Sequence, residues 1–433
     1  MSMKRTIYDS LLEWKNKKNR KPLILYGARQ TGKTWILKEF GKNEYQNVAY
    51  INCDNNPILS GSFFDFDTER LIRTFSAVTN EVIRKEETLI ILDEIQEISL
   101  ALTSLKYFQE DAPEYHIVVA GSLLGISVHA GTGFPVGKVD EMTLYPMSFT
   151  EFLLANGKDM LISYIISHDW MRDSGLNSLF QEQLRQYYYT GGMPEVVQYY
   201  VETRNLIETR NIQKRILRDY EQDFSKHIPA SQLAKVRMVY HAIPAQIAKE
   251  NKKFIFSALK KGARAKEFED AIQWLVNAGL VYKVNRVKKI DYPLKHYEGF
   301  DGFKLFVSDL GLLGAMNDTP ASQVLIGDSI FTEYKGSFTE QYICQEIMSA
   351  GCTPYYYSND NSTMKIDFVI QKERIYPIEV KAEENLRSKS LRTVLDSNTN
   401  LFGWRFSMSG YREQNRMVNV PLYYAQEWMK SNQ

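Results

Sequence analysis

The stretch that decides the fold consists of eight consecutive residues: Gly27, Ala28, Arg29, Gln30, Thr31, Gly32, Lys33 and Thr34. Together they match the pattern GxxxxGK[ST] in full, between a short apolar run and a predicted helix. Glycines let the backbone curl closely around phosphate groups, so that successive N–H groups and the helix N-terminus point at them. The stretch therefore predicts a phosphate-binding loop, although a glycine turn beside a lysine is the simpler alternative.

Side chains of the predicted loop have distinct expected roles. Lys33 would contact the β- and γ-phosphates of a nucleoside triphosphate, and the Thr34 hydroxyl would ligate Mg²⁺. The apolar run 89–92 ends in two acids, where ligands bind in open α/β sheets. Asp93 would hold Mg²⁺, and Glu94 would orient or deprotonate the attacking water. We thus expect ATP and Mg²⁺ as cofactors, although an isolated acidic strand end is usually only solvated.

A further apolar run, 116–120, leads to Ser122. A polar group in this position can sense the γ-phosphate, whereas a plain turn serine is an equal alternative. Short apolar strands that alternate with helices indicate a parallel α/β sheet over residues 1–145. The fold class we predict is α/β, of the P-loop NTPase type.

Beyond residue 145 the pattern becomes helical, and the stretch 195–220 is predicted to form one long helix. We expect a helical lid over 146–230. A helix, the Gly279 turn and an alternating strand pair then suggest a winged-helix unit over 231–327. A helix followed by three strands indicates another α/β domain over 328–433.

The whole-chain composition excludes some classes of protein. Lys and Arg number 53 against 52 Asp and Glu, so a global attraction to nucleic acid or anionic lipid is absent. The three cysteines form no CxxC pair, and the first ten residues lack the apolar core of a signal peptide. An apolar run long enough to span a membrane is also missing. We expect a cytoplasmic protein without a membrane partner.

At this point the sequence resembles the prokaryotic AAA-type ATPases of archaea and Bacteroidetes that carry a C-terminal PD-(D/E)xK nuclease-like domain. The resemblance rests on six segments: 27–34, 92–96, 120–122, 144–152, 189–195 and 365–369. It implies an AAA core, a helical lid, a winged helix and a restriction-nuclease-like end. Many relatives carry Gly-Arg where this chain has Gly137-Lys138, so we assign no arginine finger.

Asp367 and the Glu379-Val380-Lys381 segment form a second constellation, on two predicted neighbouring strands. Residues i and i+2 of a strand share a face, so Glu379 and Lys381 would point the same way. The carboxylates of Asp367 and Glu379 and the Val380 carbonyl can hold Mg²⁺. Lys381 could stabilise a hydroxide or a developing phosphate charge. Glu340 is an additional acid, and alternating charges on an edge strand are the alternative interpretation.

Two hypotheses remain open from the sequence. In the first, a Mg²⁺-dependent ATPase drives a nuclease-like domain, with DNA as the partner; a lysine cluster near residues 252–266 could contact phosphates. In the second, a nucleotide-controlled switch binds a protein partner or a second copy of itself, and the nuclease-like domain is a non-catalytic scaffold.

Overall fold

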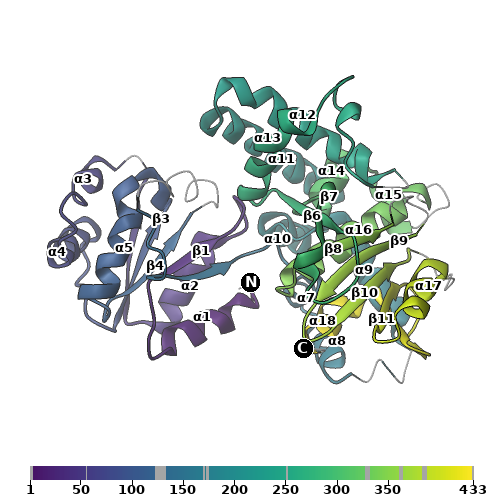
Figure 1. Ribbon diagram of the computed structural model, residues 1–433. Helices are drawn as coiled ribbons and strands as arrows, with labels where there is room; N and C mark the ends of the chain where they lie inside the picture. The colour runs from purple at the N-terminus through teal and green to yellow at the C-terminus, as the bar shows by residue number, and fades with distance from the viewer. Residues whose placement is uncertain are drawn as a thin grey trace. The chain divides into compact units, whose positions relative to one another are not determined.

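The computed structural model describes residues 3–54, 56–121, 133–168, 171, 175–249, 252–326, 332–359, 364–382 and 388–431. These residues form two compact units (Figure 1). The N-terminal unit consists of Lys4–Tyr145 together with Asn277–Leu280, and the C-terminal unit contains the other described residues.

A five-stranded parallel sheet forms the centre of the N-terminal unit, with the strand order β2-β3-β4-β1-β5. Its strands are β1 (Leu23–Tyr26), β2 (Asn47–Asn52), β3 (Thr88–Asp93), β4 (His116–Ala120) and β5 (Asp140–Thr143). The predicted α/β fold class with a parallel sheet is confirmed. Because all strands run in one direction, the carboxyl ends of β1 and β3 lie at the same edge of the sheet.

Helices cover both faces of this sheet (Figure 1). They are α1 (Ile7–Asn16), α2 (Lys33–Glu44), α3 (Pro57–Ser60), α4 (Thr68–Thr79), the 3-10 turn η1 (Ile95–Glu97) and α5 (Ser99–Asp111). On one face α1 and α2 bury Trp14 and Phe40 against the strands, and on the other α4 and α5 bury Phe75 and Phe108. Burial on both faces explains why every residue of β3 is buried.

The C-terminal unit begins with helices. They are α7 (Phe149–Ala155), α8 (Asp159–Ile166), α9 (Asn177–Thr190), α10 (Pro194–Thr203), α11 (Leu206–His227), α12 (Ala230–Ile247), η4 (Phe256–Ala258) and α13 (Ala265–Asn277). The prediction of one long helix over 195–220 is wrong. Arg204 ends α10 with a left-handed φ of 55°, and the Asn205 side chain accepts from the Glu208 amide at 3.1 Å to start α11.

An eight-stranded mixed sheet completes the C-terminal unit, in the order β12-β13-β11-β10-β9-β8-β6-β7. Its strands are β6 (Val281–Val287), β7 (Glu298–Val307), β8 (Tyr355–Ser358), β9 (Lys365–Gln371), β10 (Ile375–Val380), β11 (Gly403–Ser407), β12 (Arg412–Gln414) and β13 (Met417–Pro421). The associated helices are η5 (Leu294–Tyr297), α14 (Leu310–Met316), α15 (Ala321–Ile326), α16 (Thr332–Ser349), α17 (Lys389–Ser397), η7 (Leu422–Tyr424) and α18 (Ala425–Ser431).

The strand pair that suggests a winged helix is the antiparallel hairpin β6–β7. Strand β6 also pairs in parallel with β8, so this hairpin and the strands after residue 328 belong to one sheet. A boundary at 327/328 therefore separates two parts of a continuous sheet. The ranges 146–230, 231–327 and 328–433 stay a prediction.

Two segments behind the family resemblance contact each other inside the C-terminal unit. The Met147 amide donates to the Gly192 carbonyl at 2.7 Å, and the Gly192 amide donates to Asp309 Oδ2 at 2.6 Å. Asp309 is fully buried and also caps α14 by accepting from the Leu312 amide at 2.9 Å. A Cβ at Gly192 would lie 2.0 Å from the Met147 oxygen, so this close approach requires glycine.

Cys53, Cys344 and Cys352 are all free thiols. Across the described residues, no helix combines the length and the apolar character needed to cross a membrane.

Candidate functional site

The loop between β1 and α2 has the backbone that phosphate binding requires. Gly27 has a φ of 155°, and a Cβ there would lie 2.5 Å from the Leu144 carbonyl oxygen. Gly32 adopts a left-handed φ of 92° and immediately precedes α2. Only glycine takes both positions without strain. The loop therefore curls directly into a helix N-terminus, where backbone N–H groups have no partner within the helix.

Lys33 is the first residue of α2, and its side chain folds back into the loop. Its Nζ donates to the carbonyl oxygens of Gly27 at 2.8 Å and Ala28 at 2.9 Å. Burial lowers the pKa of the Lys33 ammonium to about 8, while the carboxylates of Glu94 and Asp93 act to raise it. An anion placed in the loop would favour the charged form.

Asp93 and Thr34 lie side by side at the carboxyl edge of the sheet. Thr34 Oγ1 donates to Asp93 Oδ2 at 2.7 Å, and the Tyr50 hydroxyl donates to the same oxygen at 3.0 Å. A hydroxyl and a carboxylate so close together are the hard oxygen ligands that Mg²⁺ prefers. These residues therefore fit the expected metal ion.

Glu94 leaves the strand direction directly after β3. Its φ of 51° is left-handed, which is uncommon for a residue with a side chain and is found preferentially at functional sites. Gln96 Nε2 donates to Glu94 Oε2, so the carboxylate has a fixed neighbour. Glu94 is half-buried and stands one residue from Asp93, where it can face a ligand at the same edge.

The remaining loop residues are also placed. Thr31 Oγ1 donates to the Ala28 carbonyl at 2.8 Å, and Gln30 has a left-handed φ of 65°, so Arg29 and Gln30 form the turn of the loop. Ser122 lies outside the described residues. Lys138, which stands where relatives carry arginine, forms an ion pair with Glu110 at 2.9 Å.

Sequence reasoning missed two residues that support this site. The buried Arg5 donates from Nη1 to the Thr31 carbonyl at 3.0 Å and from Nη2 to the Tyr145 carbonyl at 2.6 Å. It thereby ties the phosphate-binding loop to the segment after β5. Tyr50 fixes Asp93 from the neighbouring strand β2. Neither belongs to a motif, and only the sheet order brings them to the loop.

The second predicted constellation lies on the hairpin β9–β10. Asp367 Oδ2 accepts from the Val380 amide at 2.8 Å, and Lys381 Nζ lies 3.0 Å from Glu379 Oε1. The pairing of β9 with β8 shifts by one residue between Ile366 and Val369. Such a bulge often re-aims a side chain beside a functional site. The hairpin thus brings Asp367 to the backbone between Glu379 and Lys381.

One oxygen of this constellation is available for a ligand. Glu379 is 7% exposed, and its Oε2 has no hydrogen-bond partner among the described residues. A buried carboxylate oxygen without a partner is costly, and a bound cation would satisfy it. Within the described part of the chain, however, three or more acidic, His or Cys side chains do not gather as a metal-binding group. The carboxylates of Asp367 and Glu379 and the Val380 carbonyl remain the predicted ligands.

Burial and charge shape the ionisation of Asp367. Burial and the nearby Glu340 carboxylate together raise its pKa to about 6, against the opposing effect of Lys304 and Lys252. Glu340, on α16, accepts a hydrogen bond from each of these two lysines. Sequence reasoning named Glu340 and placed Lys252 in a lysine cluster that could contact phosphates, whereas the Lys252 ammonium binds Glu340. It did not name Lys304.

Strand β11 places a further buried charge next to Glu379. Arg405 pairs in register with Glu379 and is fully buried. Its guanidinium donates to Asn419 Oδ1 at 3.0 Å and to Ser388 Oγ at 2.9 Å. Burial lowers the pKa of Arg405, and the Glu379 carboxylate acts to raise it. Glu379 thus lies between cations on two sides.

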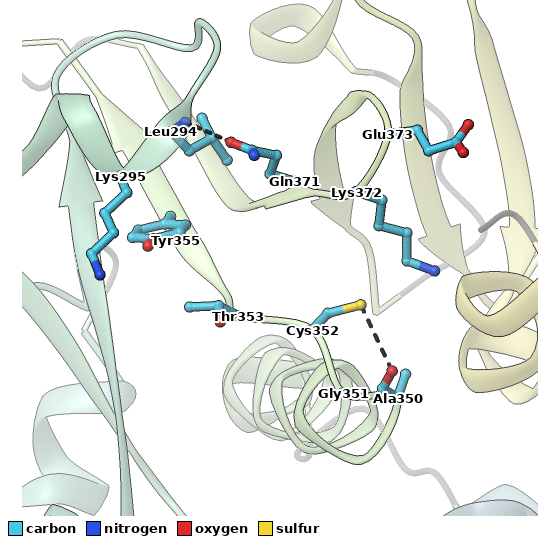
Figure 2. Close-up of a pocket in the computed structure, with 10 residues that line it drawn as sticks. All are labelled: Leu294, Lys295, Ala350, Gly351, Cys352, Thr353, Tyr355, Gln371, Lys372 and Glu373. Carbon is cyan, nitrogen blue, oxygen red and sulfur yellow. Dashed lines mark hydrogen bonds between the residues drawn. The ribbon is translucent and has the colours of Figure 1, made fainter. Parts of the chain in front are cut away.

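A cavity of about 480 Å³ lies at the turn end of the same hairpin (Figure 2). Its lining residues are Leu294, Lys295, Ala350, Gly351, Cys352, Thr353, Tyr355, Gln371, Lys372 and Glu373. The Leu294 amide donates to Gln371 Oε1 at 2.7 Å across one side of it. Asp367 and Glu379 lie at the opposite end of β9 and β10, so this cavity is separate from the predicted constellation.

Comparison with solved structures gave matches that include the following three proteins. A Walker-type ATPase of Pyrococcus abyssi is 13% identical, covering 73% of this chain and 96% of that chain, with a TM-score of 0.46. The Aeropyrum pernix ORC1 protein in complex with DNA is 13% identical, covering 74% and 92%, with a TM-score of 0.27. AMPPCP-bound DnaA from Aquifex aeolicus is 15% identical, covering 62% and 75%, with a TM-score of 0.26.

Comparison with curated proteins gave no match. Family models match three parts of the chain. Residues 181–323 and 335–423 match two different domains of unknown function. Residues 19–153, which include the phosphate-binding loop and the acidic strand end, match the family described as an AAA domain. The N-terminal unit is therefore similar to the P-loop domains of AAA-type ATPases, and this similarity supports ATP binding.

Proposed function

We propose that the chain binds ATP with Mg²⁺ and hydrolyses it at the carboxyl edge of the N-terminal sheet. The observation that carries this proposal is the 2.7 Å contact between Thr34 Oγ1 and Asp93 Oδ2, beside the loop that contains Lys33. When bound, Mg²⁺ supplies positive charge that neutralises the phosphate oxygens.

The residues of the chain divide the remaining work. Backbone amides at the start of α2 would bind the phosphates, and the Lys33 ammonium would exchange the Gly27 and Ala28 carbonyls for phosphate oxygens. Asp93, held by Tyr50, would keep the metal ligands in place. Glu94 would orient water or accept its proton, because it stands at the same edge with a carboxylate fixed by Gln96.

Exchanging Glu94 for glutamine tests the catalytic role. We expect Glu94→Gln to bind ATP with unchanged affinity and to lose hydrolysis by a factor of about a hundred or more. Glu97→Gln is the matched control, since Glu97 is an exposed acid three residues away and should keep full turnover. Lys33→Ala should lose ATP binding. Equal turnover in Glu94→Gln and Glu97→Gln would remove Glu94 from the mechanism.

A second candidate function is metal-dependent phosphodiester cleavage at the C-terminal constellation. It is favoured by the buried, unpartnered Glu379 Oε2 beside the backbone-anchored Asp367. These carboxylates and the Val380 carbonyl would hold a divalent cation, and Lys381 would stabilise negative charge that develops on a phosphate. DNA is the substrate we propose, in a cytoplasmic setting that is consistent with three free thiols.

A cleavage assay on plasmid and single-stranded DNA separates this function from a binding role. Native protein should cleave in the presence of a divalent cation, and Lys381→Ala should not. Lys389→Ala provides a control, because it removes an exposed lysine of α17 that does not belong to the constellation. If neither native protein nor Lys381→Ala cleaves while ATP turnover persists, the better proposal is a nucleotide-controlled switch. Its C-terminal unit would then bind a protein partner or a second copy of the chain.

A further inference from the structure

Two lysines hold Glu340 from opposite oxygens. Lys252 Nζ donates to Glu340 Oε1, and Lys304 Nζ lies 3.3 Å from Oε2. All three side chains are largely buried, with 12%, 7% and 9% of the Lys252, Lys304 and Glu340 side chains exposed. In this environment a charge is stable only when it is paired, so the three groups depend on one another.

Both lysines are fixed by additional contacts. Lys304 donates to the Asp367 carbonyl at 3.3 Å and packs over the rings of Tyr356 and Phe368. Lys252 donates to the Gly336 carbonyl at 3.3 Å and has a left-handed φ of 49°. A lysine in this strained backbone conformation is maintained by its surroundings. The two ammonium groups are therefore built into the cluster and are not solvated surface charges.

The charges of the cluster balance. Glu340 and Asp367 contribute two carboxylates, and Lys252 and Lys304 contribute two ammonium groups. Both ammonium groups contact Glu340, and that of Lys304 also contacts the Asp367 carbonyl. The neighbouring Glu379 is compensated by Lys381 and by the buried Arg405. A divalent cation carries the same charge as the two lysines together. The lysines therefore supply the compensation that a metal ion would supply to Glu340 and Asp367.

We infer that Lys252 and Lys304 are internal counter-ions that compete with a divalent cation for the C-terminal carboxylates, and so set its affinity. This inference rests on the proposed cation site at Asp367 and Glu379. With both lysines in place, the carboxylates are stable without a metal ion, and a cation alone binds weakly because it meets two nearby positive charges. Removal of either lysine leaves an uncompensated acid and creates a stronger cation site.

Calorimetric titration of the full chain with Mn²⁺, without nucleotide, tests the competition. Lys304→Met and Lys252→Met remove one charge each and keep an unbranched apolar stem that packs like that of lysine. We expect Mn²⁺ to bind about tenfold more tightly to each variant than to native protein. Lys253→Met is the matched control, because it removes the same charge at the adjacent, half-buried position. Its Mn²⁺ affinity should equal that of native protein.

Thermal unfolding provides a second measurement that does not depend on activity. In a chelator, Lys304→Met should unfold at a lower temperature than native protein, and Mn²⁺ should restore most of the difference. The variant that also carries Asp367→Asn should lose this restoration. If Lys304→Met fails to fold even in Mn²⁺, or binds Mn²⁺ no more tightly than Lys253→Met, the lysines serve packing only and the inference is overturned.

The same titrations separate this inference from the proposed site itself. Native protein that binds Mn²⁺ through Asp367, with no gain in either lysine variant, contradicts the counter-ion role and leaves the cation site in place. Absence of Mn²⁺ binding in native protein and in every variant contradicts both.

Discussion

The proton on Lys33 should set the upper pH limit of nucleotide binding. Burial lowers the pKa of this ammonium group to about 8. Only the charged form attracts phosphate, so the binding-competent fraction falls as the pH rises through that value. One unit above the pKa, about one molecule in ten retains the charge. The apparent Kd for ATP should therefore be about tenfold higher near pH 9 than near pH 7.

The free protein should show the opposite trend in stability. The folded pKa of Lys33 lies below the unfolded value of about 10.4, so the unfolded chain binds more protons between these two values. The free energy of unfolding contributed by Lys33 thus rises as the pH increases from about 8 to about 10. A bound triphosphate favours the ammonium form, and binding near pH 8 should therefore take up about half a proton per site.

Calorimetry with the Glu94→Gln protein measures both quantities, because this variant is expected to bind ATP without consuming it. Titrations in buffers of different ionisation enthalpy give the number of protons taken up, and a pH series gives the affinity. Lys33→Met is the control, and any residual binding by it should be independent of pH over this range. An affinity that stays constant between about pH 7 and pH 9, without proton uptake, would refute the reasoning.

Two further perturbations test buried polar contacts, one beside the phosphate-binding loop and one inside the C-terminal unit. Arg5→Ala removes two charged hydrogen bonds to the carbonyls of Thr31 and Tyr145. Chemical denaturation should show that the free energy of unfolding falls by about 2 to 4 kcal/mol, and ATP binding should weaken. Lys4→Ala, at an exposed residue, should change neither quantity. Burial raises the pKa of Asp309 to about 6, above its unfolded value, so the stability it contributes is complete below about pH 4 and is lost as the pH rises to about 6. In a pH series of unfolding measurements, this pH-dependent loss of stability should be about 3 kcal/mol, and Asp309→Asn should abolish it. Asp318→Asn is the control and should retain the loss, because Asp318 is an exposed residue paired with Lys214.

The N-terminal site was predictable because its signals are local. The loop glycines, Lys33 and Thr34 are consecutive, and the strand-to-helix context can be read from neighbouring residues. Parallel strands then place Asp93 at the same edge without further information. Arg5 and Tyr50 could not be predicted in this way. Their contacts depend on the strand order and on the path of α1, and neither residue belongs to a periodic pattern or a motif.

For the C-terminal constellation, only the neighbourhood of residues within the β9–β10 hairpin could be predicted from the sequence. Asp367 reaches the backbone next to Glu379 because a short turn fixes the register, and this neighbourhood can be inferred from spacing. The break between α10 and α11 was missed because Arg204 and Asn205 carry a weak stop signal inside a helical pattern. The parallel pairing of β6 with β8 was also missed, since it joins segments that the chain order separates widely.

That long-range pairing explains why the compensation of Glu340 and Asp367 by lysines could not be predicted from the sequence. Lys304 lies on β7, the edge strand that pairs with β6, and β6 in turn pairs with β8. This arrangement places the Lys304 ammonium group beside Glu340 and the Asp367 carbonyl. In the sequence, Lys304 is a single lysine between Phe303 and Leu305, and no motif marks it as a buried charge. Only the continuous sheet turns it into a buried partner of the acids. If the lysines act as counter-ions, substitutions on the β6–β7 hairpin can change the metal affinity of the site while Asp367, Glu379 and Lys381 stay the same. The acidic motif alone therefore does not determine whether the site cleaves DNA.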